Sequence, residues 1–157
     1  MSSSMSVTLR KITEDNLYTI LDLKVTPAQE NFVASNAESL AEALFHQDVA
    51  WFRAIYADDV PVGFVMLVDD PTIPLYELWR FMVDANFQQQ GIGRRAITLV
   101  ANYVRTRPNA RFLLTSCVEG EGSPAQFYEK VGFISTGEKD EDGELIMKLK
   151  LADAVTT

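Results

Sequence analysis

A strand, a glycine-containing turn and a helix follow one another between residues 75 and 105, and this unit constrains the fold more than any other part of the chain. Leu75–Val83 is rich in aromatic and aliphatic side chains, as strands usually are. Beyond the turn, apolar residues recur at helical spacing as far as Arg105, and Pro108 follows the predicted helix. We therefore expect a sheet with this helix packed on it. The apolar helix positions are Ile92, Ala96, Leu99, Val100 and Tyr103.

The turn has features that suit an anion. Its glycines let the backbone approach a ligand closely, and the first N–H groups of the following helix have no partner within the helix. Together with the helix dipole, such groups bind phosphate or pyrophosphate. An ordinary helix-initiating turn would look similar, because neither the Walker lysine pattern nor the six-position dinucleotide fingerprint is present. The turn comprises Gln88, Gln89, Gln90, Gly91, Ile92, Gly93 and Arg94.

The chain before this unit predicts a first strand, two helices and a hairpin. The apolar spacing changes from alternation to helical periodicity and back, and turn residues separate the segments. The predicted elements are the strand Val7–Ile12, a helix capped by Thr13 and broken at Pro27, a helix from Ser35 or Asn36 that buries Leu40, Leu44 and Phe45, and the strands Trp51–Ala57 and Val62–Val68.

The chain after the unit predicts a buried strand, a short helix and a closing hairpin. Arg111–Val118 is almost continuously apolar, which favours a strand covered on both faces. A short helix begins with Pro124 at its first position and ends at Gly132. The hairpin joins Phe133–Glu138 to Glu144–Leu151. The order of elements predicts an α/β (α+β) fold, in which helices flank a mixed sheet on both sides.

Length and residue counts limit the class of protein. The 157 residues suit one domain, placed at residues 1–157 with a core from about 7 to 151. One cysteine and one histidine exclude an intrachain disulfide and a Cys/His zinc site, so no metal is predicted. No apolar run approaches the roughly 20 residues of a membrane span. The N-terminus does not resemble a signal peptide, and we expect a cytoplasmic protein without membrane association.

The formal net charge is −8, which argues against a nucleic-acid partner because such proteins need a basic footprint. An acidic surface attracts cationic partners by electrostatic steering. The same acidity would also serve simply to keep the protein in solution.

Two segments resemble the GNAT acetyltransferase superfamily. Gln88, Gly91 and Gly93 match its Gln/Arg-x-x-Gly-x-Gly/Ala turn, and residues 128–133 match its Tyr-Glu-Lys-x-Gly-Phe segment in the correct order. The resemblance runs from about Val7 to Leu151 and, within the superfamily, points to bacterial spermine/spermidine acetyltransferases. It implies an acyl-CoA N-acyltransferase fold, with a mostly antiparallel sheet of about seven strands and about four helices. It also implies acetyl-CoA as cosubstrate and allows a homodimer.

The resemblance further implies how coenzyme A is held. The strands that start at Leu75 and Arg111 would splay apart to admit it, and amides of the turn would hold its pyrophosphate. Glu121 stands where many relatives have an asparagine that contacts the coenzyme, which puts that contact in doubt. The residues expected to bind the coenzyme are Phe81, Met82 and Val83 through their backbones, Gln88 to Arg94 of the turn, and Ser123, which would replace the asparagine through its hydroxyl or by capping the helix that follows.

Two residues are candidate carriers of protons. The resemblance implies that Tyr128 returns a proton to the leaving thiolate as general acid, a role that suits a phenol because it stays protonated at neutral pH. Its alternative is a core tyrosine with a satisfied hydroxyl. Glu77 lies fourteen positions before Gly91, where some members of the superfamily carry their base, and apolar neighbours would raise its pKa. Its alternatives are an exposed strand carboxylate and a mechanism that uses ordered water.

Acidic residues in the second predicted helix and before it are candidates for holding a cationic substrate. The resemblance places this segment over the acceptor side, where carboxylates would bind the ammonium groups of a polyamine. A solvated helix face is equally compatible with the spacing. The candidates are Glu30, Glu38 and Glu42, with Asp48 nearby and with Asp69 and Asp70 either in the groove or at a strand end.

Three functions follow from these expectations. The first is a polyamine N-acetyltransferase that works by direct transfer in a ternary complex, with a small cationic amine as its partner. The second keeps the donor and changes the acceptor to another small amine, an amino acid, an aminoglycoside or a peptide amine. The third is a silent module that senses coenzyme A or polyamines.

Overall fold

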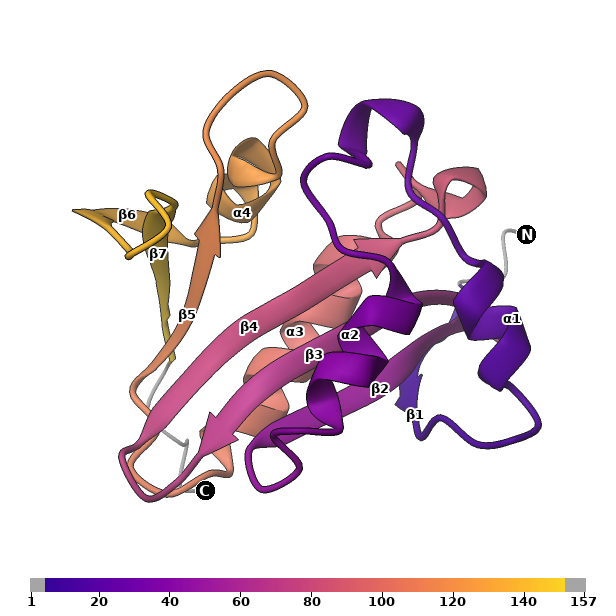
Figure 1. The fold of residues 1–157 in the computed structure, drawn as a ribbon, viewed down its shortest axis with the longest axis horizontal. Coiled ribbons are helices and arrows are strands. Elements are labelled where there is room, and N and C mark those ends of the chain that lie inside the picture. Colours follow the sequence, from indigo (N-terminus) through magenta and orange to yellow (C-terminus); the bar gives the residue numbers. More distant parts are fainter. Residues whose placement is uncertain (1–4, 152–157) are drawn as a thin grey trace.

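The computed structural model describes residues 5–151, in which helices cover both faces of one seven-stranded sheet (Figure 1). The predicted fold class, with a mixed sheet of seven strands and four α-helices, is confirmed for these residues. Among them, no helix combines the length and apolarity needed to cross a bilayer. The strands are β1 (Val7–Arg10), β2 (Ala50–Ala57), β3 (Val60–Asp70), β4 (Leu75–Val83), β5 (Phe112–Cys117), β6 (Ile134–Lys139) and β7 (Leu145–Lys150).

The strands lie in the order β1-β2-β3-β4-β5-β7-β6. Every neighbouring pair is antiparallel except β4 and β5, which are parallel. Parallel neighbours need a long crossover, and the helix predicted after the glycine turn provides it. The helices are α1 (Leu17–Asp22), α2 (Asn36–Ala43), α3 (Ile92–Arg105) and α4 (Ala125–Lys130), together with the 3-10 turns η1 (Pro27–Gln29) and η2 (Ala85–Phe87).

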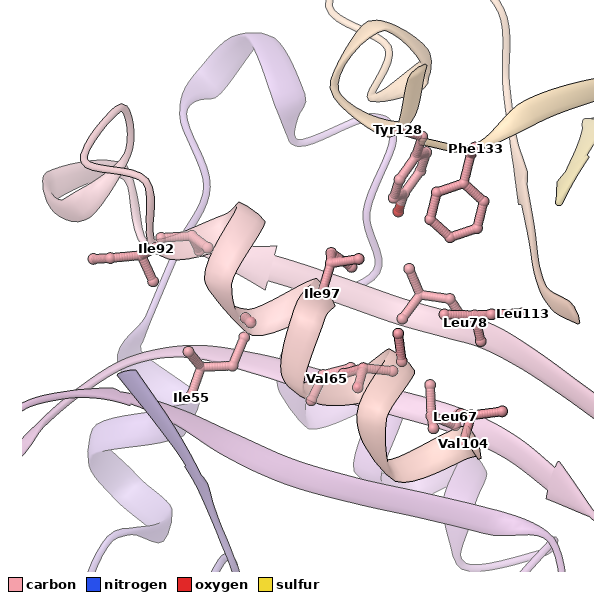
Figure 2. Packing of buried hydrophobic residues seen from close by; sticks show 14 of the residues in the cluster. Ile55, Val65, Leu67, Leu78, Ile92, Ile97, Val104, Leu113, Tyr128 and Phe133 are labelled. Carbon is pink, nitrogen blue, oxygen red and sulfur yellow. The ribbon is translucent and has the colours of Figure 1, made fainter. Parts of the chain in front are cut away.

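Helix α3 builds the larger core on one face of the sheet. Its buried stripe packs against inward-facing residues of the central strands, as Figure 2 shows for Ile97 above Val65 and Leu78. Tyr128 of α4 and Phe133 after it complete this core, and their rings lie side by side in the same view (Figure 2). The buried helix residues are Ile92, Ala96, Ile97, Val100, Ala101 and Val104.

Helices α1 and α2 cover the other face (Figure 1). Ile20 of α1 and Ala43 of α2 pack there with Phe64 and Met66 of β3 and Met82 of β4. The predicted start of α2 is confirmed, because the Ser35 hydroxyl accepts a hydrogen bond from the backbone N–H of Glu38. The sheet therefore separates two apolar layers, and a group that passes between two strands can reach both.

Two predictions of burial were wrong. Leu44 and Phe45 are 60% and 81% exposed, because α2 ends at Ala43 and the chain turns away from the sheet there. Strand β5 is not covered on both faces: Leu113, Thr115 and Cys117 are buried, whereas Phe112 is exposed. On the other face of β5, Leu114 and Ser116 are only partly buried.

The caps of two helices also differ from expectation. Asn16, three residues after Thr13, occupies the N-cap position of α1, so the helix starts at Leu17. The Asn16 side chain accepts a hydrogen bond from Thr13 N and donates one to Tyr56 Oη, which holds the helix start against β2. Pro124 occupies the N-cap of α4 and not its first helical position.

Candidate active site

Strands β4 and β5 pair over only two residues and then diverge. Glu77 lies opposite Leu114 and Leu78 opposite Thr115, and beyond these pairs the ribbons separate (Figure 1). At the last pair, the Thr115 hydroxyl donates a hydrogen bond to the Leu78 carbonyl (3.3 Å). The expected splay of these two strands is thus present.

A β-bulge in β4 lies just beyond this fork. Met66 of β3 is opposite Arg80 and Leu67 is opposite Leu78, so Trp79 is an extra residue in the strand. Bulges bend a strand and increase its twist, which helps β4 to leave β5. The opening forms the mouth of a cleft of about 960 Å³, which reaches both faces of the sheet. Phe81 and Met82, expected to bind the pantetheine arm, lie on its wall.

Tyr128 lines the cleft from the α3 side of the sheet. It is 6% exposed and contacts the rings of Phe127 and Phe133. Burial raises the pKa of its phenol well above the ordinary value, and a hydrogen bond with Thr115 opposes that rise. The phenol is therefore protonated throughout the neutral range, at a site between the two diverging strands.

Glu77 lines the same cleft from the opposite face, since side chains alternate along β4 and both Tyr76 and Leu78 point into the α3 core. Its pKa is raised above the ordinary glutamate value, first by burial and then by the negative charges of Asp140 and Glu144. A half-buried carboxylate with a raised pKa is suited to accept a proton near neutral pH.

Only some of the acidic residues predicted to hold a cationic substrate line the cleft. Glu30 and Glu38 line it from the loop before α2 and from α2 itself. Glu42 instead forms an ion pair with Arg80, whose Nη2 lies 3.1 Å from Oε2 of Glu42. Asp48 and Asp70 are not among the lining residues. Asp69 is buried in a separate network with Tyr103 and Arg107, so it ends its strand outside the groove.

The hairpin between β6 and β7 adds three carboxylates that the sequence analysis did not single out. Asp140, Asp142 and Glu144 line the cleft, and one oxygen from each lies within 4.8 Å of the others. Asp140 Oδ1 accepts hydrogen bonds from the backbone N–H groups of Asp142 and Glu144 (both 2.9 Å). The signal available in the sequence was the acid-rich stretch from Glu138 to Glu144, which was considered only as a turn.

The glycine turn lies at the far end of β4, outside this cleft. Gly91 is the N-cap of α3 with a left-handed φ of 79°, and Gln89 has a φ of 64°. Gly93 packs closely, since a Cβ there would lie 3.1 Å from the Phe127 ring. The first amides of α3 have no partner within the helix, and binding of an anion by them stays a prediction.

Other expected donor-site residues are placed around the turn and the fork. Val83 ends β4, Arg94 Nη2 donates to the Lys130 carbonyl (3.2 Å), and the Ser123 hydroxyl accepts from the Ala125 N–H (3.2 Å) at the start of α4. Glu121 is exposed in the loop before α4. The Ser123 hydroxyl therefore binds a backbone N–H in the first turn of α4, two residues after Glu121.

Comparison with known proteins identifies a family that shares this architecture. The model of the acetyltransferase (GNAT) family matches residues 17–133. The spermine/spermidine N(1)-acetyltransferase of Bacillus subtilis (strain 168) is 25% identical over 94% of this chain and 100% of its own length. The probable spermine N(1)-acetyltransferase of Bacillus subtilis subsp. natto (strain BEST195) matches at the same identity and over the same shares of both chains.

Two solved structures share the fold. Spermidine N-acetyltransferase from Vibrio cholerae, in complex with CoA and spermine, superposes with a TM-score of 0.72 at 17% identity, over 96% of this chain and 98% of that one. The PaiA N-acetyltransferase from Thermoplasma acidophilum, in complex with coenzyme A, gives a TM-score of 0.67 at 20% identity, over 93% and 99%. With the family model spanning most of the elements around the cleft, this chain belongs to the acetyltransferase (GNAT) family.

Proposed function

We propose that this enzyme transfers the acetyl group of acetyl-CoA to a primary amine of a small polycation such as spermidine or spermine. One observation carries the proposal: carboxylates from three separate parts of the chain line one cleft. Opposite charges within a partly enclosed cleft bind ammonium groups and raise their local concentration. The names of the Bacillus subtilis relatives point the same way. The lining carboxylates are Glu30 and Glu38, then Glu77, then Asp140, Asp142 and Glu144.

Coenzyme A would enter from the side of the glycine turn. Amides from Gln89 to Arg94 would bind the diphosphate, and the backbone of Phe81, Met82 and Val83 would bind the pantetheine arm. The thioester then comes to lie at the fork, because the strands open directly beyond Leu78 and Thr115. In this arrangement the sulfur is on the side of Tyr128, and the carbonyl faces the carboxylates.

The chemistry needs three proton transfers. The ammonium nitrogen of the acceptor loses a proton to Glu77, directly or through one water, and the neutral amine attacks the thioester carbonyl. A C–N bond forms, the tetrahedral intermediate collapses and the C–S bond breaks. Tyr128 donates its proton to the departing thiolate as general acid, and the second proton of the attacking nitrogen, acidic once the C–N bond has formed, passes through water to the Tyr128 phenolate. The products are an N-acetylated amine and free coenzyme A, and no covalent enzyme intermediate is required.

The test is mass spectrometry of purified enzyme incubated with acetyl-CoA and a mixture of amines. The mixture holds spermidine, spermine, putrescine, an aminoglycoside, an amino acid and a peptide with a free N-terminus. We expect acetylated spermidine or spermine to dominate. Turnover of another amine with no acetylated polyamine would assign the enzyme a different acceptor. If coenzyme A binds but no amine is acetylated, the protein would be a sensor of coenzyme A or polyamines.

The acidic lining has a matched control within one hairpin. Glu144→Gln removes a carboxylate that lines the cleft, and Glu141→Gln removes one from the same hairpin that does not. We expect Glu144→Gln to raise the KM for spermidine about tenfold, which corresponds to about 1.4 kcal/mol. Glu141→Gln should leave it within twofold. Equal effects would mean that only the overall charge of the hairpin matters.

A further inference from the structure

Residues 24–35, here called the acceptor loop, connect α1 to α2 and form one wall of the cleft. Glu30 and Phe32 are among the residues that line it. The loop has one short 3-10 turn, η1, and its position depends on hydrogen bonds to other parts of the chain. Two of these contacts come from the segment that leads from β4 to the glycine turn.

The first contact holds the start of the acceptor loop. The Asp84 carboxylate accepts a hydrogen bond from the backbone N–H of Lys24 (2.8 Å), and the Lys24 carbonyl accepts one from the backbone N–H of Ala85 (2.8 Å). Asp84 is 8% exposed and also accepts from the N–H of Asn86 (3.0 Å). A buried carboxylate with these partners forms a stable anchor.

The second contact holds the loop at η1. The side-chain amide of Gln88 donates one hydrogen bond to Gln29 Oε1 (2.8 Å) and another to the carbonyl of Val83 (2.8 Å). Gln29 Oε1 also accepts from the backbone N–H of Thr26 (3.4 Å), which closes the cap of η1. Both protons of the Gln88 amide group are thus used, and they join the end of β4 to the acceptor loop.

Gln88 is also the first residue of the glycine turn. The next residue, Gln89, has a left-handed φ of 64°, which is uncommon outside glycine, and Gly91 follows with a φ of 79°. A diphosphate bound by amides of this turn would therefore restrict the backbone beside Gln88. That restriction passes to Gln29 through a single side chain.

We propose that Gln88 is a positioning residue. When coenzyme A occupies the glycine turn, the hydrogen bond from Gln88 to Gln29 holds the acceptor loop in the position that binds the amine. The inference rests on the proposed function, since it connects the donor and acceptor sites of that reaction. Its consequence is that the amine binds more tightly once coenzyme A is bound.

The first test measures hydrogen–deuterium exchange with and without coenzyme A. In the wild type, we expect coenzyme A to slow exchange in the turn at residues 88–94 and also in the acceptor loop. The slowing in the acceptor loop should be about fivefold, which is the factor that one hydrogen bond of ordinary net strength supplies. Gln29→Met removes the oxygen that accepts the hydrogen bond and keeps a side chain of similar size. In this variant, coenzyme A should still slow exchange in the turn but no longer in the acceptor loop. Gln29→Glu keeps an oxygen at this position and should restore the slowing in the acceptor loop.

The control is Gln47→Met, because the Gln47 side chain donates to the Leu44 carbonyl and does not line the cleft. Thermal melting establishes that each variant is folded. Protection of the acceptor loop that persists in Gln29→Met, or is missing in the wild type while the turn is protected, would overturn the inference. No protection of the wild-type turn would instead count against the proposed donor site.

The second test uses steady-state kinetics. Gln29→Met and Gln88→Met should each raise the KM for the amine about fivefold, and the double variant should do no more, because both remove one shared contact. The KM for acetyl-CoA and kcat should stay within twofold in Gln29→Met. An equal rise in the KM for acetyl-CoA would mean that Gln29 acts on the cofactor. The amine used is the one that the wild type acetylates fastest.

Discussion

The hydroxyl of Thr115 bonds to the carbonyl of Leu78 at the last position where β4 and β5 are paired. Thr115 is 1% exposed, and its side chain lies close enough to Tyr128 to oppose the rise that burial causes in the pKa of that phenol. One buried side chain therefore ends the pairing of the two strands and contacts the proposed general acid. The position of Tyr128 and the point where the cleft opens are set together.

Thr115→Val should affect both stability and catalysis. Loss of the buried hydroxyl should lower the free energy of unfolding by about 1 kcal/mol. It should also reduce kcat several-fold, since the Thr115 hydroxyl no longer opposes the rise in the Tyr128 pKa. Thr115→Ser keeps the hydroxyl and should retain most of kcat. Urea denaturation and steady-state rates measure the two effects, and equal kcat values for the two variants would contradict the role of the hydroxyl.

Tyr128→Phe should lower kcat by about 100-fold, the lower end of what a general acid contributes, and leave the KM for acetyl-CoA almost unchanged. Because burial raises the Tyr128 pKa, the wild type should show no loss of kcat from phenol ionisation up to about pH 10. A pH profile of kcat checks this. Tyr103→Phe, which changes a tyrosine outside the cleft, is the control. Full activity of Tyr128→Phe would remove the assignment.

Glu144→Gln should stabilise the protein at neutral pH while it weakens binding of the amine. Burial and the neighbouring Asp140 and Asp142 raise the Glu144 pKa, so the folded state favours its protonated form. The stability from that form is present at low pH and is lost as the pH rises through the raised pKa. Urea denaturation at pH 4 and pH 7 should show that the free energy of unfolding falls less between these pH values for Glu144→Gln than for the wild type. Parallel curves would indicate that repulsion at this site is absent.

The same variant should shift the pH dependence of activity. Glu144 is one of the charges that raise the Glu77 pKa, so its removal should lower that pKa. If Glu77 is the base, the acidic limb of the kcat/KM profile moves to lower pH. Measurement over pH 5–8, with Glu141→Gln as control, tests the assignment. An unchanged limb would favour ordered water as the base.

The Tyr103–Asp69 contact should make stability fall at high pH. Burial, followed by the hydrogen bond to Asp69, raises the Tyr103 pKa to about 12. Stability from the neutral phenol is complete below the unfolded pKa near 10 and is lost as the pH rises toward 12. Urea denaturation between pH 9 and 12 should show a steeper decline for the wild type than for Tyr103→Phe. Equal slopes would contradict the shift.

Local patterns predicted most of the elements. The bounds expected for the strand Leu75–Val83 are those of β4, and the glycine turn precedes α3 as expected. The predicted burial of Leu44 and Phe45 was wrong because periodicity does not state where a helix ends. The apolar run around β5 was misread, since composition does not show how many faces of an edge region a helix covers.

Spacing and turn chemistry act between residues close in the chain, so they already determined the order of strands and helices and the amide-rich turn at Gly91, whereas Tyr128 became a candidate through the family resemblance. The tertiary structure alone decided which carboxylates meet. The sheet places β7 and β6 beyond β5, which brings the Asp140–Glu144 hairpin into one cleft with Glu77 although more than 60 residues separate them. It also paired Glu42 with Arg80 and Gln29 with Gln88, because such contacts join segments that are far apart in the sequence.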